Sequence, residues 1–342
     1  MTDSAALFER SLAQTGEICR ELGFSPRWAG PLRRAVLAGR EPELPPGLLA
    51  ALPERVILIE SQVVARTSAP DGAEKFLIRL LDCETVEAVR LPGAVRGSAC
   101  LSTQVGCAMA CRFCASGLEG ARRNLAAYEI LEQVALLRRG GPVERLVLMG
   151  SGEPTQNLGA VVAALGVLKE EGGIGPRHVL LSTVGPPAAV ARVTATGLKV
   201  TLALSLHALD RGLRGELIPT QAHVEPLDLL AAADAHAVAT RRPYQVEYVL
   251  LGGVNDSTAQ ARDLAAALHG RRAHVSLIPW NPVAEQSFAP PVPGAAAEFL
   301  AVLRAAGVSA VLRRTVGSEA HAACGQLRIA HARDRAPVEI QV

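Results

Sequence analysis

The alternation of strand-like and helix-like segments after residue 97 constrains the fold of this chain more than any other feature. Helical patterns at residues 127–139, 158–171, 227–236, 259–269 and 295–306 are separated by six apolar runs, at 99–103, 145–149, 178–183, 198–206, 245–251 and 274–279. Such alternation predicts an α/β fold, with a parallel sheet covered by helices. We expect an open partial barrel of six βα units. A doubly wound sheet is the alternative, because sequence does not reveal strand order.

The residues before the barrel differ in pattern. Apolar positions repeat with helical spacing near the start, and Pro42, Pro45 and Pro46 follow, which predicts a small helical module over residues 1–50. Residues 51–96 are expected to connect it to the barrel through short antiparallel strands at 56–64, 75–82 and 85–91, with Asp71-Gly72 as a turn. The third part, residues 97–342, is the barrel and its C-terminal segment.

Composition excludes several classes of protein. With 49% apolar and 20% charged residues the chain is globular, and no apolar run approaches the roughly 18 residues of a membrane span. The start lacks a secretory pattern, so the expected location is the cytoplasm. A net charge of +2 does not by itself indicate nucleic-acid binding. Paired arginines are either a phosphate-facing surface or solvated helix ends; they occur at 122–123, 138–139, 241–242, 271–272 and 313–314.

Four of the seven cysteines lie between Cys100 and Cys114. Cys107, Cys111 and Cys114 have the compact spacing with which one loop can bind a 4Fe–4S cluster through three thiolates. The fourth iron would then be open to the amino and carboxylate groups of S-adenosylmethionine. The alternative is a zinc knuckle with Cys100 as the fourth ligand, although zinc sites generally take paired ligands from two separate segments.

Further motifs make the chain resemble the radical S-adenosylmethionine RNA methyltransferases of the RlmN/Cfr type, which methylate an adenosine at carbon 2 or carbon 8. The resemblance covers roughly residues 75 to 330. It rests on the cysteine loop with Cys100-Leu-Ser-Thr-Gln-Val-Gly-Cys107, and on Arg123-Asn-Leu125, Gly152-Glu-Pro154, Ser205-Leu-His207, Val254-Asn-Asp256, Ile278-Pro-Trp-Asn-Pro282 and Ala322-Ala-Cys-Gly-Gln-Leu327. It implies a radical S-adenosylmethionine partial barrel that carries the cluster and this cofactor.

The resemblance also assigns catalytic roles. Cys324 would receive a methyl group and present it to the base, and Cys100 would resolve the resulting protein–RNA adduct by forming a transient disulfide with Cys324. Glu87 occupies the position of the family's proton acceptor, with Glu84 as a local competitor.

The expected cofactor-binding residues follow successive strands. Gly152 allows a close backbone approach, and the Glu153 carboxylate can hold the cofactor ammonium group. Polar groups at other strand ends can reach the ribose or adenine; these residues are Ser182, Ser205, Leu206, His207 and Asn281.

The chain departs from the family pattern at three places: Ser151 before Gly-Glu-Pro, Thr155-Gln156 after it, and Glu319-Ala320 ahead of Cys324. The implied partners are ribosomal RNA, transfer RNA or both, and an electron donor such as flavodoxin or ferredoxin, with a monomeric enzyme. The rival hypotheses are a radical enzyme with a non-RNA substrate and a non-catalytic, zinc-stabilised RNA-binding protein.

Overall fold

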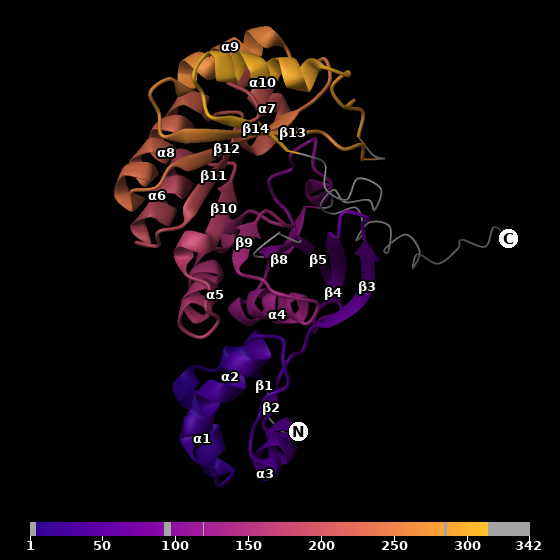
Figure 1. The fold of residues 1–342 in the computed structure, drawn as a ribbon, viewed down its shortest axis with the longest axis vertical. Helices are drawn as coiled ribbons and strands as arrows, with labels where there is room; N and C mark the ends of the chain where they lie inside the picture. The colour runs from indigo at the N-terminus through magenta and orange to yellow at the C-terminus, as the bar shows by residue number, and fades with distance from the viewer. Residues whose placement is uncertain (1–4, 92–96, 119, 284–285, 314–342) are drawn as a thin grey trace, which may run out of the picture.

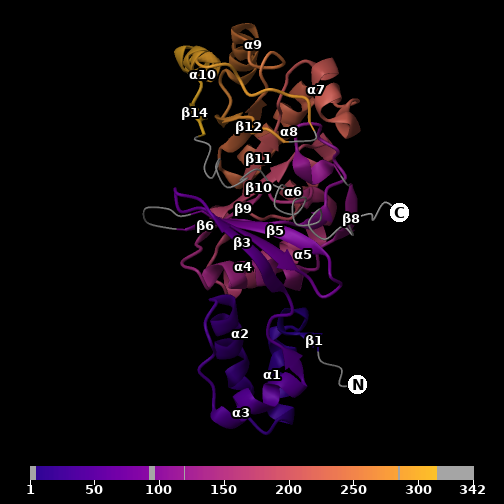
Figure 2. The same ribbon diagram turned by 90° about the vertical axis from the view of Figure 1, so that its right-hand side faces the viewer.

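The fold is built around one ten-stranded sheet, seen in Figures 1 and 2 in a computed structural model that describes residues 5–91, 97–118, 120–283 and 286–313. Seven strands are parallel and neighbour one another in chain order: β6 (Ser98–Cys100), β9 (Arg145–Leu148), β10 (Val179–Thr183), β11 (Thr201–Ser205), β12 (Tyr244–Leu250), β13 (Ala273–Pro279) and β14 (Ala310–Leu312). A doubly wound sheet reverses its strand order at a switch point. The uninterrupted order therefore contradicts that alternative and confirms the partial barrel.

All six expected barrel strands are present, and β14 is a seventh that we did not predict. It spans only three residues, which is too short for a recognisable strand pattern. The helices after the cysteine loop are α4 (Ala127–Arg138), α5 (Leu158–Glu170), α6 (Pro187–Ala195), α7 (Arg211–Leu217), α8 (Pro226–Thr240), α9 (Thr258–Leu268) and α10 (Ala295–Ala305). Five were predicted, whereas the short helices α6 and α7 were not.

Alternation along β12 shows which face of the sheet is covered. Tyr244, Val246, Tyr248 and Leu250 lie in an apolar cluster with side chains of α8, α9 and α10. Residues between them, such as Glu247, therefore point to the opposite, inner face. Side chains on this inner face are not covered by the helices, so they can contact a ligand inside the partial barrel.

Three antiparallel strands extend the sheet beyond β6: β5 (Thr85–Leu91), β4 (Glu74–Arg79) and β3 (Gln62–Ser68). The predicted strand at residues 56–64 is wrong in its bounds. Backbone N–H groups of Glu60 and Ser61 donate to the carboxylate of Glu132 on α4, at 2.9 Å each, and this contact separates β3 from the two-residue strand β2 (Val56–Ile57).

The N-terminal helices lie beside α4 and α5 at one end of the molecule (Figure 1). They are α1 (Leu12–Glu21), α2 (Ala29–Leu37) and α3 (Pro46–Ala51), and β2 pairs with β1 (Ala5–Ala6). The module predicted over residues 1–50 is mainly helical, but Ala5–Ala6 form the short strand β1. Pro46 begins α3 rather than ending a helix, since the first helical position tolerates a residue without an N–H group.

The module and the barrel share one hydrophobic core. Leu7, Leu32 and Leu37 belong to the same buried cluster as Leu131 and Leu165 of the barrel helices. The Arg33 guanidinium reinforces this contact by donating to both carboxylate oxygens of Glu171, at 2.7 and 3.0 Å. Within the described part of the chain, no helix is both long and apolar enough to cross a membrane.

Candidate active site

The cysteine loop is closed at its base by a two-stranded antiparallel ribbon, β7 (Gln104–Gly106) and β8 (Ala121–Asn124). Gly106 has a φ of +75°, and a Cβ atom there would lie 1.9 Å from the carbonyl oxygen of Gly120. Only glycine fits such an approach. The Cys107 N–H donates to the same carbonyl at 3.0 Å, so the loop starts and ends at one point.

Within this loop the three predicted cluster ligands lie near one another. Burial raises the pKa of the Cys107 thiol to about 12 and that of Cys111 well above its ordinary value, and the negative charges of neighbouring thiolates and of Glu153 add to the effect. Ionisation is thus opposed while no cation is bound. Metal-bound cysteines are thiolates, so this group of thiols suits a cationic centre that offsets their charge.

The described side chains do not gather around a single point. Among residues 5–91, 97–118, 120–283 and 286–313, no three His, Cys, Asp or Glu side chains are placed to hold one metal ion. In a 4Fe–4S cluster each thiolate binds a different iron, so the sulfurs lie further apart than around one ion.

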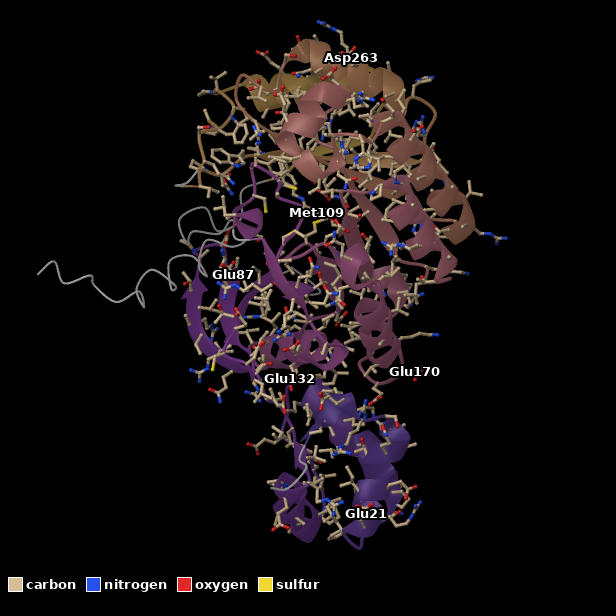
Figure 3. The ribbon with its side chains drawn as sticks, turned by 180° about the vertical axis from the view of Figure 1, so that it is seen from behind. Glu21, Glu87, Met109, Glu132, Glu170 and Asp263 are labelled. Carbon is tan, nitrogen blue, oxygen red and sulfur yellow. The ribbon has the colours of Figure 1, made fainter. Side chains whose placement is uncertain are left out.

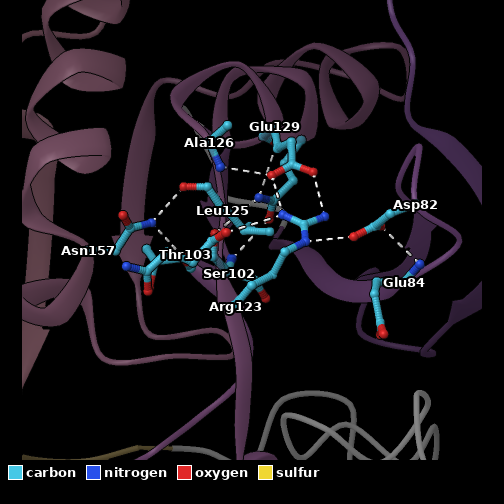
Figure 4. Close-up of polar contacts among 11 residues, drawn as sticks. Asp82, Glu84, Ser102, Thr103, Arg123, Leu125, Ala126, Glu129 and Asn157 are labelled. Atoms are coloured by element: carbon cyan, nitrogen blue, oxygen red, sulfur yellow. Dashed lines mark hydrogen bonds and ion pairs between the residues drawn. The ribbon is translucent and has the colours of Figure 1, made fainter.

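Polar contacts hold the ribbon in place (Figure 4). Arg123 donates to both oxygens of Glu129 on α4, at 2.8 Å each, and to Asp82 at 2.6 Å. The Asn157 amide donates to the carbonyls of Thr103 and Leu125, at 2.8 and 2.7 Å. Arg123 of the Arg-Asn-Leu motif therefore fixes the cysteine loop to α4 and to the antiparallel strands.

Gly152 and Glu153 follow β9 at the edge of this loop. Gly152 has a φ of +106°, and a Cβ atom would lie 2.6 Å from that of Gln104. The Glu153 carboxylate accepts hydrogen bonds from Thr155 N at 3.1 Å, Thr155 Oγ1 at 2.7 Å and Val184 N at 3.1 Å. Burial raises the pKa of Glu153. These bonds orient the carboxylate before any ligand binds.

Two departures from the family pattern have a structural role here. The Thr155 hydroxyl donates to the Glu153 carboxylate at 2.7 Å, in addition to the bond from its backbone N–H. Ser151 Oγ donates to the carbonyl of Gly106, the residue before the first cluster cysteine, at 3.1 Å. Both polar side chains thus stabilise the site.

The other predicted cofactor residues lie at neighbouring strand ends. Ser182 Oγ and Ser205 Oγ are 3.1 Å apart across β10 and β11. Asn281 is half-buried just after β13, next to Trp280, whose Nε1 donates to the carbonyl of Phe113 in the cysteine loop at 2.8 Å. The Leu206 side chain is buried in the helix-facing core, so only its backbone can contribute to the site.

His207 lies directly against the cysteine loop. Its ring makes an edge contact with Phe113, with centroids 4.7 Å apart. Nδ1 accepts a hydrogen bond from Val249 N at 3.0 Å, which leaves the proton on Nε2. Burial lowers the pKa of His207 to about 3, helped by the positive charge of Arg214. Asn255, from the Val-Asn-Asp motif, donates to the His207 carbonyl at 2.8 Å and so holds this turn.

Glu87 and Cys100 share one face of the sheet. Cys100 pairs with Val89 of β5, and Glu87 lies two residues from Val89, so alternation puts all three side chains on the same side. Glu87 is buried, with its Oε2 3.4 Å from Nζ of Lys75. Figure 3 shows Glu87 on the antiparallel strands below the loop of Met109. Its competitor Glu84 is instead bound by Arg122, at 2.8 and 3.0 Å.

Cys324, with Glu319 and Ala320, lies outside the described residues. Sequence reasoning missed the buried Arg214 on α7, because a single arginine in a short unpredicted helix has no pattern that marks it. A cavity of about 540 Å³ between the module and the barrel contains none of the predicted site residues; among its lining residues are Arg40, Leu58 and Arg139.

Most of the paired arginines bind within the chain. Arg122 contacts Glu84, Arg271 contacts Asp234, and Arg313 contacts Glu247. Arg138 donates to backbone carbonyls of Leu37, Val143 and Gly172. These side chains are therefore engaged by groups of the protein itself, which does not favour a common phosphate-facing surface.

Comparison with known proteins agrees with the geometry. Residues 101–265 match the model of the radical SAM superfamily. A probable dual-specificity RNA methyltransferase RlmN from Rhodopirellula baltica is 42% identical over 94% of this chain and 90% of its own length. One with the same description from Thermosynechococcus vestitus is 45% identical over 78% of this chain and 80% of its own.

A solved structure is similar over nearly the whole molecule. The radical SAM methyltransferase from Sphaerobacter thermophilus superposes with a TM-score of 0.86 at 36% identity, covering 94% of this chain and 98% of the other. Sequence identity, coverage and fold thus lead to one assignment: the chain belongs to the RlmN family of RNA methyltransferases in the radical SAM superfamily.

Proposed function

We propose that this protein methylates an adenosine of RNA, at carbon 2 or carbon 8, through a methylated Cys324 and a transient disulfide with Cys100. The observation that carries the proposal is the loop on which Cys107, Cys111 and Cys114 lie together, beside strand ends with polar side chains. Membership of the superfamily implies S-adenosylmethionine and a 4Fe–4S cluster. When bound by these three cysteines, the cluster would supply one-electron reduction of the cofactor.

The cofactor is proposed to lie between the cysteine loop and the strand ends. Glu153, already oriented by Thr155 and Val184, would accept hydrogen bonds from its ammonium group, and Gly152 allows the backbone to approach. Its ribose and adenine would contact Ser182, Ser205, the backbone of Leu206, His207 and Asn281. His207 stays neutral and donates from Nε2, because Nδ1 is already an acceptor.

Three side chains would take part in the reaction with the RNA base. Cys324 carries the one-carbon unit to it, which joins the protein and the RNA covalently. Glu87 then takes the proton from the modified carbon, and Lys75 stabilises this buried carboxylate. Cys100, on losing its thiol proton, attacks the sulfur of Cys324 and forms a disulfide. The carbon–sulfur bond breaks with its electron pair on carbon, which takes up a proton, so that the base leaves with a methyl group. A thiol or another reductant must then reopen the disulfide. The position of Glu87 and Cys100 on one face of the sheet supports this division of roles.

The substrate is proposed to be ribosomal RNA, transfer RNA or both, because the relatives are described as dual-specificity RNA methyltransferases. A small electron-transfer protein such as flavodoxin or ferredoxin would supply the electrons, and the enzyme would act as a monomer.

The test is anaerobic purification and reconstitution, followed by mass spectrometry of RNA nucleosides. We expect iron and sulfide in the wild type and methyladenosine in the RNA. Cys324→Ala should keep the cluster and cofactor binding but lose methylation, and Cys100→Ala should accumulate a protein–RNA adduct. Cys19→Ala, which removes a buried thiol of the N-terminal module, is the matched control and should remain active. Normal turnover without Cys100 or Cys324 refutes the mechanism, and iron-free protein containing stoichiometric zinc refutes the enzyme.

A further inference from the structure

Arg214 is a fully buried cation beside the cysteine loop. Nε donates to the carbonyl of Leu206 at 3.0 Å, and Nη2 donates to those of Val184 at 2.6 Å and Ser205 at 3.2 Å. Nη1 is also buried, and among the described residues it has no hydrogen-bond partner. No carboxylate in the described part of the chain forms an ion pair with this guanidinium.

A buried charge is costly unless an opposite charge compensates it. Burial lowers the pKa of Arg214 only to about 10, so the guanidinium is charged at neutral pH. Backbone carbonyls offset part of the cost through their dipoles, but they carry no net charge. The compensating charge must therefore come from a bound group, and Arg214 lies close enough to Cys111 for opposite charges at the two positions to attract.

The chain around Arg214 also packs on the cysteine loop. Arg112 N donates to the carbonyl of Leu217 at the end of α7, at 2.9 Å, and Thr220 Oγ1 donates to that of Met109 at 3.1 Å. Leu213 and Leu217 share an apolar cluster with Met109 and Cys111. The distance between the cation and the loop is therefore fixed by packing on both sides of Arg214.

We propose that Arg214 is the counter-cation of the iron–sulfur cluster and raises its reduction potential. This inference rests on the proposed function, in which Cys111 binds the cluster. Reduction adds one electron from an external reductant and thus one negative charge, while Arg214 keeps its proton in both states. A fixed nearby cation stabilises the more negative, reduced state more than the oxidised state. Through its carbonyl contacts, Arg214 also positions the strand ends that carry Ser182 and Ser205.

The test compares cluster potentials in anaerobic titrations followed by electron paramagnetic resonance. Arg214→Met removes the charge, and Arg214→Lys keeps it while losing the forked geometry. We expect the midpoint potential of the cluster in Arg214→Met to be more negative than in the wild type by at least about 59 mV. For one electron, this shift lowers the reduced-to-oxidised ratio at a given potential tenfold. Arg214→Lys should lie close to the wild type. The matched control is Arg138→Met, since Arg138 also donates only to backbone carbonyls but lies at the far end of α4, and it should leave the potential unchanged.

Each outcome decides the proposal. A cluster with wild-type potential in Arg214→Met overturns it. If that variant holds no iron, Arg214→Gln carries the same measurement, because its amide can still donate to a carbonyl. If both uncharged variants lose the cluster and Arg214→Lys retains it, the cluster requires a positive charge at position 214, as proposed. If Arg214→Lys also loses the cluster, the role of Arg214 is structural and the proposal fails. A wild type without any cluster refutes the proposed function instead.

Discussion

The ion pair between Arg33 and Glu171 should contribute strongly to the attachment of the N-terminal module. The side chains are 1% and 9% exposed, and the Arg33 guanidinium also donates to the carbonyls of Leu7 and Arg10, at 3.0 and 2.6 Å. At 2.7 Å, their attraction is roughly 6 kcal/mol with an effective dielectric constant of about 20, and desolvation cancels much of it. Loss of one partner leaves the other charge buried, which costs about 3–5 kcal/mol.

A double-mutant cycle tests this reasoning. Arg33→Met and Glu171→Met should each lower the free energy of unfolding by about 3–5 kcal/mol. The double variant buries neither charge and should lose only about 1–3 kcal/mol, mostly because the Leu7 carbonyl lacks its donor.

Urea unfolding can be followed at both ends of the molecule, because the chain has only two tryptophans. Trp28 reports on the module and Trp280 on the cysteine loop, and Trp→Phe variants separate their fluorescence. Single variants that each lose less than about 1 kcal/mol, or a double variant that loses the sum of both, would show that the pair is solvated.

Three further results are expected. Gly152→Ala should weaken S-adenosylmethionine binding by about tenfold or more while circular dichroism stays unchanged, because the new Cβ would displace the loop of Glu153; equal affinity would contradict this. Asn157→Ala should lower the free energy of unfolding in urea by about 2 kcal/mol or more, because two carbonyls lose a donor, and a loss below about 0.5 kcal/mol would count against it. In the folded protein the pKa of His207 is about 3, against an ordinary value of 6.5 for histidine. As the pH falls below 6.5, the imidazole therefore takes up a proton in the unfolded chain but not in the folded one. Stability should therefore fall by about 2 kcal/mol from about pH 7.5 to about pH 5, and less in His207→Asn; an equal slope in both proteins would be the refuting result.

Sequence predicted the features that depend on local pattern. The six barrel strands and five of the covering helices have apolar runs with clear periods, and the cysteine spacing identifies one loop. The meeting of Ser182 and Ser205 followed from the rule that parallel strands end at the same edge. Short elements such as α6, α7 and β14 give too few residues for a period.

Contacts between distant residues could not be predicted. Arg33 and Glu171 are 138 positions apart, and only the folded chain brings them together. The break between β2 and β3 depends on Glu132, more than 70 residues later. For the pair that includes Arg138, the sequence left a phosphate-facing surface and a solvated helix end open. Arg138 instead binds three backbone carbonyls, because a lone sequence does not reveal which arginines are enclosed.

The core shared by the N-terminal helices and the barrel limits how this family can be re-engineered. Leu7, Leu32 and Leu37 fit against side chains of α4 and α5, so a module from a relative would meet a foreign surface. A functional chimaera would have to transfer the matching faces of α4 and α5, and the residue at position 171, together with the module. Recombination among relatives should therefore tolerate crossovers inside the barrel better than at the junction near residue 60.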